Sequence, residues 1–124
     1  MPVRSLSSSV LSWPDRRSVD AAARRWAESA APAHPGTLAI GYFGSYARGD
    51  AGVGSDLDLL VVVDEAALPF FERPLEWSLA GLPVPAEALI YTVDEWRRLA
   101  EEGTRFARVL LDETVWVWGE RPAV

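Results

Sequence analysis

Residues 57–63, with the sequence LDLLVVV, constrain the fold more than any other segment of this chain. Apart from Asp58, every residue in the segment is leucine or valine, so both faces of an extended chain would be apolar here. Such a pattern is typical of a strand at the centre of a sheet that is covered on both sides. The segment therefore predicts a layered domain built around a sheet.

Other segments supply the neighbours of this strand. Alternating or continuous apolar residues predict three further strands, at residues 37–43, 84–91 and 114–118. Apolar spacing, caps and breakers predict helices at residues 18–31, 92–102 and 104–111, with Ser18 as N-cap of the first and a Thr92–Glu95 capping box opening the second. Residues 66–80 have helical spacing interrupted by Pro69 and Pro74, so we expect a helix there that starts late or is kinked.

The link between residues 37–43 and 57–63 sets the topology. It is too short for a parallel crossover, so the two strands should be antiparallel, with a short helical turn at residues 45–48. The order of elements predicts an α+β fold, in which a mixed sheet of about four strands has helices packed on it. The length of 124 residues fits a single domain, residues 1–124, in which we expect residues 1–14 to be irregular and mobile.

Composition excludes several classes of function. The net charge of −6 argues against stable binding to a nucleic-acid backbone. All 12 basic residues are arginine, which excludes a P-loop lysine and a Schiff-base lysine, and the lack of cysteine excludes disulfides and thiolate chemistry. No apolar run is long enough to span a membrane and the N-terminus lacks a signal-peptide pattern, so we expect a cytoplasmic protein.

Two aspartates stand at the start of the central strand. Residues two apart in a strand point to the same face, so Asp56 and Asp58 should project together, with Cα atoms about 6–7 Å apart. Two unpaired carboxylates among leucines are costly, and a divalent cation such as Mg²⁺ would resolve the conflict. The alternative is that both acids lie at a solvated strand end and only terminate it.

The loop before these aspartates favours the metal site. Gly44 and Ser45 follow a strand and open a turn in which main-chain N–H groups and the serine hydroxyl can hold phosphate oxygens. A phosphate cradle beside a metal site is typical of an enzyme that uses a nucleoside triphosphate. Ser55, just before the aspartates, is expected to orient the loop.

The pattern G-S-x-A-R-G, five residues, then S-D-x-D-L runs from Gly44 to Leu59. It resembles the minimal nucleotidyltransferase (MNT) branch of the DNA polymerase beta-like nucleotidyltransferase superfamily. Coarser similarity continues to the C-terminus through a Tyr-Thr-x-x-Glu-Trp helix start and a late Arg-Phe-Ala-Arg helix. The resemblance implies the nucleotidyltransferase fold.

The resemblance also implies a third metal-binding carboxylate on a neighbouring strand. Glu87 is the only charge between Glu76 and Asp94 and lies within the apolar segment 84–91, which makes it the candidate, although the family more often has aspartate there. The alternative is a glutamate on an exposed edge of the sheet. Arg48 would either reach the triphosphate or hold the loop by bonding carbonyls or Asp50.

By resemblance, the activity is transfer of a nucleoside monophosphate, AMP from ATP, with one or two Mg²⁺ ions, to an acceptor hydroxyl. The acceptor implied is a tyrosine on a small helical HEPN-type toxin, with this chain acting as antitoxin; homo-oligomerisation is left open. Two alternatives remain: a catalytically weak or silent antitoxin that acts by binding, and transfer to a small molecule such as an aminoglycoside.

The remaining aromatic residues are expected to be structural. Trp26, Trp77 and Trp96 should anchor the core, whereas His34, in a Pro/Gly-rich connector, should be an exposed loop residue. Strict alternation in residues 114–118 would put Trp116 and Trp118 on one face, where the pair could be exposed. The Arg16-Arg17 and Arg24-Arg25 pairs should form a solvated helix face.

Overall fold

The computed structural model describes residues 13–124. Mobility was expected for residues 1–14, of which residues 1–12 lie outside the described part of the chain. Helices, strands and one 3-10 helix (η1) follow in the order α2 (Arg16–Ala33), β1 (Thr37–Phe43), α3 (Ser45–Arg48), β2 (Leu57–Val63), η1 (Phe70–Glu76), β3 (Ala86–Thr92), α4 (Val93–Glu102), α5 (Arg105–Glu113) and β4 (Val115–Gly119).

The four strands form one mixed sheet in the order β3-β2-β1-β4. β1 is antiparallel to both β2 and β4, while β2 and β3 are parallel. The central strands β1 and β2 are almost fully buried, as the apolar pattern of residues 57–63 predicts. The predicted α+β class, the mixed sheet and the antiparallel pairing of β1 with β2 are therefore confirmed.

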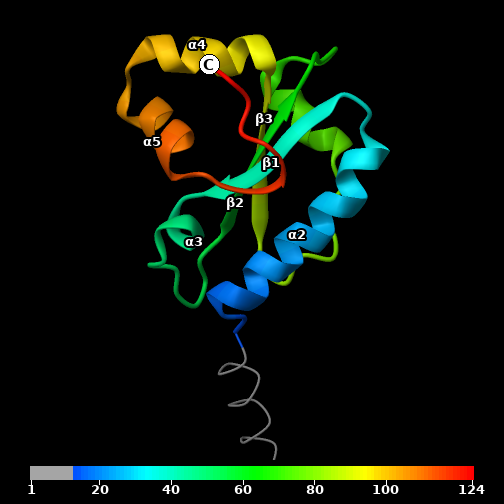
Figure 1. Ribbon diagram of the computed structural model, residues 1–124. Helices are drawn as coiled ribbons and strands as arrows, with labels where there is room; N and C mark the ends of the chain where they lie inside the picture. The colour runs from blue at the N-terminus through cyan, green and yellow to red at the C-terminus, as the bar shows by residue number, and fades with distance from the viewer. Residues whose placement is uncertain (1–12) are drawn as a thin grey trace, which may run out of the picture.

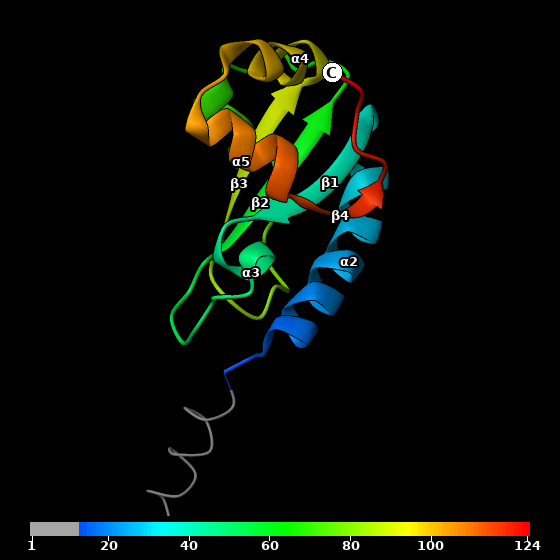
Figure 2. The same ribbon diagram turned by 60° about the vertical axis from the view of Figure 1, so that its left-hand side comes forward.

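Helices cover both faces of the sheet. Figure 2 shows α2 along one face and α4 with α5 on the other; Figure 1 shows the same elements from a second direction. The α2 face contains Val19, Ala23 and Trp26 of the helix packed with Leu59 and Val61 of β2. On the other face, Trp96, Leu99, Ala107 and Leu110 of α4 and α5 pack on Leu60 and Val62. Alternate residues of β2 thus serve two separate core layers.

The first helix starts earlier and ends later than predicted. Its N-cap is Asp15 rather than Ser18: the Asp15 carboxylate accepts a hydrogen bond of 2.8 Å from Ser18 N. Pro32 lies inside the last turn, and the helix continues to Ala33. A proline in the last turn removes one hydrogen bond but cannot prevent the turns before it from forming.

The segment predicted as a kinked helix at residues 66–80 is mostly irregular. Only η1 is helical, and it begins directly after Pro69 and contains Pro74. Pro74 has no N–H to donate, which limits the segment to a short 3-10 helix. Strand β3 likewise begins after Pro85, whose carbonyl accepts a hydrogen bond from Leu57 N at 2.8 Å.

The last strand departs from strict alternation. Ile40 of β1 pairs with Trp118 and Gly41 pairs with Trp116, so the register shifts between them. The shift puts the two tryptophans on opposite faces: Trp116 packs edge-on against Trp96, and Trp118 packs with the α2 layer. Both are half-buried, so the prediction of an exposed pair is wrong.

Local caps define the two C-terminal helices. The predicted capping box is present, because Thr92 Oγ1 accepts from Glu95 N and Glu95 Oε1 accepts from Thr92 N. Gly103 ends α4 in the left-handed region, and Thr104 caps α5, which runs two residues beyond the predicted end at residue 111. None of the helices in residues 13–124 has the length and apolar character needed to cross a membrane.

Candidate active site

The turn after β1 is held in one conformation by both its glycines and its neighbours. Gly44 has φ of 78° and ψ of −150°, a combination open essentially only to glycine. One short helical turn follows, and Gly49, in the left-handed region, ends it with a hydrogen bond from its N–H to Ser45 O. Main-chain N–H groups of Ser45 and its neighbours therefore lie next to the start of β2.

The side chains of Trp13 and Arg16, which lie outside this loop, fix its position through hydrogen bonds. The buried Tyr46 donates its hydroxyl proton to Ser55 O at 3.4 Å and accepts from Trp13 Nε1 at 3.3 Å. Arg16 of α2 donates to Tyr46 O at 3.1 Å and to Ala47 O at 3.2 Å. Arg16 was predicted to belong to a merely solvated face; it is exposed, but it also satisfies carbonyls that the short helix leaves free.

Asp56 and Asp58 lie together at the beginning of β2, as predicted, and line the same cavity. Asp58 is half-buried, and its carboxylate lies against the Cα atom of Gly44, where any β-carbon would collide with it. Burial raises the pKa of Asp58, and the nearby charges of Glu87 and Asp56 raise it further, while Arg48 acts in the opposite direction. The fold thus holds at least one carboxylate in an environment that disfavours its charge.

Glu87 of β3 pairs in register with Asp58 across the parallel strands. Paired residues on adjacent strands point to the same face, which here is the α4–α5 face. Glu87 is exposed and does not line the cavity of the two aspartates. It has the exposed edge position that the sequence left as the alternative, yet it stands next to Asp58.

The donor chemistry of these residues fits Mg²⁺, which prefers carboxylate oxygens and keeps positions open for phosphates and water. Asp56 and Asp58 make no ion pair or side-chain hydrogen bond to any residue in the range 13–124, so their oxygens are free for a cation. Within the same range, no three His, Asp or Glu side chains lie close enough to form a ready-made metal site. Asp56 and Asp58 could together hold a cation, and Glu87 would need to turn toward them to join.

The cavity in front of the aspartates has a volume of about 450 Å³. Both polar and apolar side chains line it. The lining residues are Phe43, Gly44, Ser45, Arg48, Ser55, Asp56, Asp58, Phe106 and Val109. Phe106 of α5 is 49% exposed and packs edge-on against Phe43, with ring centroids 6.0 Å apart. A lining that combines charged and aromatic side chains suits a molecule with both a charged and a flat apolar part.

Arg48 and Ser55 also lie at this cavity. Arg48 donates from Nε to Asp50 Oδ2 at 3.3 Å, which is one of the two roles predicted for it, and its exposed end remains at the cavity rim. Ser55 Oγ accepts from Gly52 N at 2.9 Å and so orients the loop, as expected. Phe106 and Val109 were not predicted, because the apolar spacing of α5 does not indicate which of its residues face a site rather than the core.

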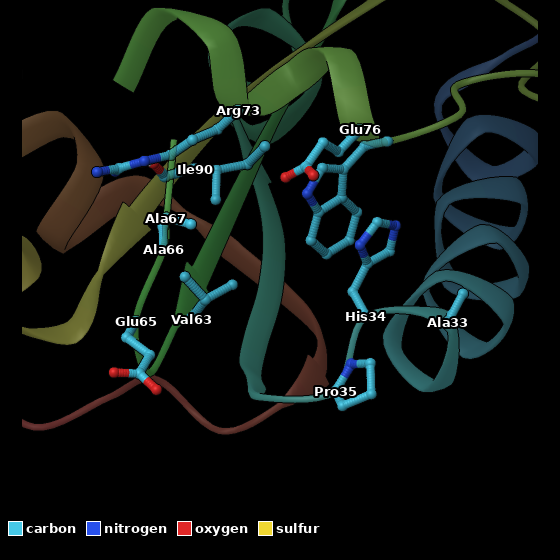
Figure 3. Close-up of a pocket in the computed structure, with 11 residues that line it drawn as sticks. Ala33, His34, Pro35, Val63, Glu65, Ala66, Ala67, Arg73, Glu76 and Ile90 are labelled. Carbon is cyan, nitrogen blue, oxygen red and sulfur yellow. The ribbon is translucent and has the colours of Figure 1, made fainter. Parts of the chain in front are cut away.

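A second cavity lies at the opposite end of β2 and is drawn in Figure 3. It is smaller, about 230 Å³, and Val63, His34, Glu65 and Arg73 are among its lining residues. His34 is half-buried and stacks on Trp77, with ring centroids 3.7 Å apart and planes 8° apart, so the prediction of a purely exposed loop residue is wrong. The predicted core positions of Trp26, Trp77 and Trp96 are confirmed.

Comparison with known proteins supplies a family. The family described as "Nucleotidyltransferase domain" matches residues 27–117, which include every candidate site residue. A Sulfolobus solfataricus protein classed as a nucleotidyltransferase shares 23% identity and has a TM-score of 0.62, covering 85% of this chain and 84% of its own. A toxin–antitoxin structure with AMP-PNP shares 16% identity with a TM-score of 0.54, covering 82% of this chain and 74% of its own. Comparison with curated protein sequences found no match.

Proposed function

Because this chain belongs to the nucleotidyltransferase domain family, we propose that it transfers AMP from ATP to a hydroxyl group of a partner protein, with Mg²⁺ bound at Asp56 and Asp58. The acceptor is a tyrosine of a HEPN-type toxin, and modification of that tyrosine makes this chain an antitoxin. The family resemblance of the Gly44–Leu59 motif supports this acceptor, as does the fold shared with a toxin–antitoxin protein that was crystallised with AMP-PNP.

The observation that carries the proposal is the position of Asp58. Its carboxylate is half-buried and lies against the Gly44 turn. Burying a charge without a partner is costly, and a fold keeps such an arrangement where something else supplies the partner. A cation shared with nucleotide phosphates would do so, and the main-chain N–H groups of the adjacent turn are available for those phosphates.

The roles of the residues follow from their positions. Asp56 and Asp58 would hold the cation, and Glu87, after a side-chain rotation, would join them; bound Mg²⁺ neutralises phosphate charge and acidifies a hydroxyl. Ser45 and the N–H groups of its turn would bind the phosphates that leave as pyrophosphate. The acceptor oxygen forms a bond to the α-phosphorus. The bond from the α-phosphorus to the oxygen that bridges it to the β-phosphorus breaks, and pyrophosphate leaves. The hydroxyl proton passes to the Glu87 carboxylate.

The test is transfer of label from ATP labelled on the α-phosphate. Wild-type protein and the Asp56→Asn/Asp58→Asn double variant are each incubated with Mg²⁺ and an extract of the source cells. If the proposal is correct, a small protein in the extract becomes labelled with the wild type and none becomes labelled with the double variant. Equal labelling by both proteins would exclude the two aspartates from the reaction. The cytoplasm, where ATP is abundant, is the proposed location.

A second candidate function is an antitoxin that acts by binding alone. The observation in its favour is Glu87, which is exposed, lies outside the cavity of the aspartates and stands where the family more often has aspartate. This candidate expects a stable complex with the partner and no transfer of label by the wild type. The same experiment therefore separates the two functions.

A further inference from the structure

The 3-10 helix η1 exposes two large apolar side chains. Phe71 is 91% exposed and Leu75 is 82% exposed, the two highest values among the large apolar residues of the described chain. The Phe71 ring packs edge-on against the neighbouring Phe70 ring, with centroids 5.5 Å apart, and its exposure shows that it adds little to the core. Exposed apolar side chains that gather beside a cavity mark a binding surface more often than single ones do.

η1 is held rigidly beside the edge strand β3. Its anchor is Arg73, which is 8% exposed and donates to Leu68 O, to Ile90 O of β3 and to both carboxylate oxygens of Glu95. Figure 3 shows Arg73 extending from η1 past Ile90. Phe70 packs on Tyr91 with ring centroids 5.0 Å apart. The exposed pair is therefore presented by a fixed element.

Between η1 and β3 lies an apolar groove of about 380 Å³, here called the η1 groove. Phe70, Phe71 and Pro74 line one side of it, and Ala86, Glu87 and Leu89 line the other. Glu87 lines this groove but not the cavity of the two aspartates, and it lies beside Asp58 because the two residues pair in register. The η1 groove and the cavity of Asp56 and Asp58 share no lining residue, and the paired residues Asp58 and Glu87 line one hollow each.

The exposed charged side chains on the two elements that form the η1 groove are acidic. Arg73 is the only basic residue between Arg48 and Arg97, and its charge is paired with Glu95. Glu72 on η1 and Glu87 in the groove are both exposed. A partner with positive charge around an apolar segment would be attracted to such a surface and oriented on it.

We propose that the η1 groove is the docking surface for the protein acceptor, a cationic polypeptide segment whose apolar side chains cover Phe71 and Leu75 and whose hydroxyl reaches Glu87. This inference rests on the proposed function and adds to it the direction of approach. The nucleotide enters from the Gly44 side of Asp58, and the acceptor enters from the β3 side. The acceptor oxygen can then reach the α-phosphorus from the side away from the leaving pyrophosphate.

The test compares wild-type protein with Phe71→Ser/Leu75→Ser and with the control Leu38→Ser. Leu38 is 40% exposed and lies next to Thr37, which pairs with the far end of β2, away from the η1 groove. Two quantities are measured: the initial rate of α-label transfer to the protein acceptor in cell extract, and the affinity for Mg²⁺ with AMP-PNP by equilibrium dialysis. Circular dichroism checks the fold of each variant.

The double variant should lose at least about tenfold in transfer rate, because it removes two apolar side chains that the bound acceptor would cover. Its affinity for AMP-PNP should equal that of the wild type, and Leu38→Ser should behave as wild type in both measurements. Raising the salt concentration should slow transfer by the wild type, since the charge attraction is screened.

Four results would overturn the proposal. Equal transfer by the double variant would refute docking in the η1 groove while leaving the proposed function intact. Label on a small molecule instead of a protein would refute a protein acceptor. If the purified chain is a dimer that becomes a monomer in the double variant, the groove is an interface between copies. Finally, wild-type protein that binds AMP-PNP but transfers no label would refute the proposed function, and the acceptor site with it.

Discussion

Replacement of Gly44 by alanine tests how the turn and the carboxylate depend on each other. At φ of 78° and ψ of −150°, alanine is strained by about 1–3 kcal/mol. Its β-carbon would also collide with the Asp58 carboxylate, which must then move. We therefore expect the free energy of unfolding to fall by about 2 kcal/mol or more, and transfer from ATP to be lost even under conditions in which the variant is fully folded.

Two other glycines of the same loop separate strain from collision. Gly54 has φ of 88° and no atom within 4 Å of the place that a β-carbon would occupy, so Gly54→Ala should cost about 1 kcal/mol and keep most of the activity. Gly52 has neither a positive φ nor a close neighbour, so Gly52→Ala should be nearly neutral. Urea denaturation gives the stabilities and α-label transfer gives the activities. If Gly44→Ala matches Gly54→Ala in both measurements, contact with Asp58 is irrelevant and the account of the turn is refuted.

Three further predictions concern charge. Asp58→Asn should reduce transfer by at least about 100-fold while leaving the thermal midpoint unchanged or higher, because it removes a half-buried charge; a variant with normal turnover would contradict its role. Mg²⁺ with AMP-PNP should raise the melting temperature of the wild type, and EDTA should abolish the shift; Asp56→Asn/Asp58→Asn should show none, and an equal shift would place the ligand elsewhere. Glu95→Gln should lower the free energy of unfolding at pH 7 by about 1–3 kcal/mol, because Arg73 loses a charged partner. Hydrogen bonds from Arg73 lower the pKa of Glu95 in the folded protein. The extra stability of the wild type over Glu95→Gln is therefore present above the ordinary glutamate pKa and should disappear as pH falls through the lower pKa of the folded state. Urea titrations at pH 7 and pH 3 would contradict this reasoning if the difference in free energy of unfolding were the same at both pH values.

Much of the fold could be predicted because short-range patterns agree with long-range packing. The apolar run of β2, the short link to β1 and the Thr92 capping box each determine local structure almost alone. Asp56 and Asp58 were placed together correctly because a two-residue spacing in a strand fixes their common side. Glu87 was chosen because the family resemblance implies a third carboxylate on a neighbouring strand; its place beside Asp58 depends on the strand register, which a single sequence does not specify.

The misses have identifiable physical causes. The register shift at Gly41 reverses the side of Trp118 relative to Trp116, and periodicity cannot reveal a bulge. Asp15 and Ser18 are both good N-cap residues. Asp15 is the N-cap because its carboxylate accepts a hydrogen bond from Ser18 N, three residues further along the chain. Arg16, Phe106 and His34 gain their roles from residues distant in the sequence, so their surroundings could be known only from the folded chain.

In the proposed reaction, the α-phosphate of ATP is transferred to a protein hydroxyl. The most direct test runs two reactions in parallel, one with ATP labelled on the α-phosphate and one with ATP labelled on the γ-phosphate, each with Mg²⁺, wild-type protein and the acceptor. Nucleotidyl transfer should leave α-label on the acceptor and release γ-label as pyrophosphate. Finding γ-label on the acceptor would show phosphoryl transfer instead and would contradict the proposed reaction.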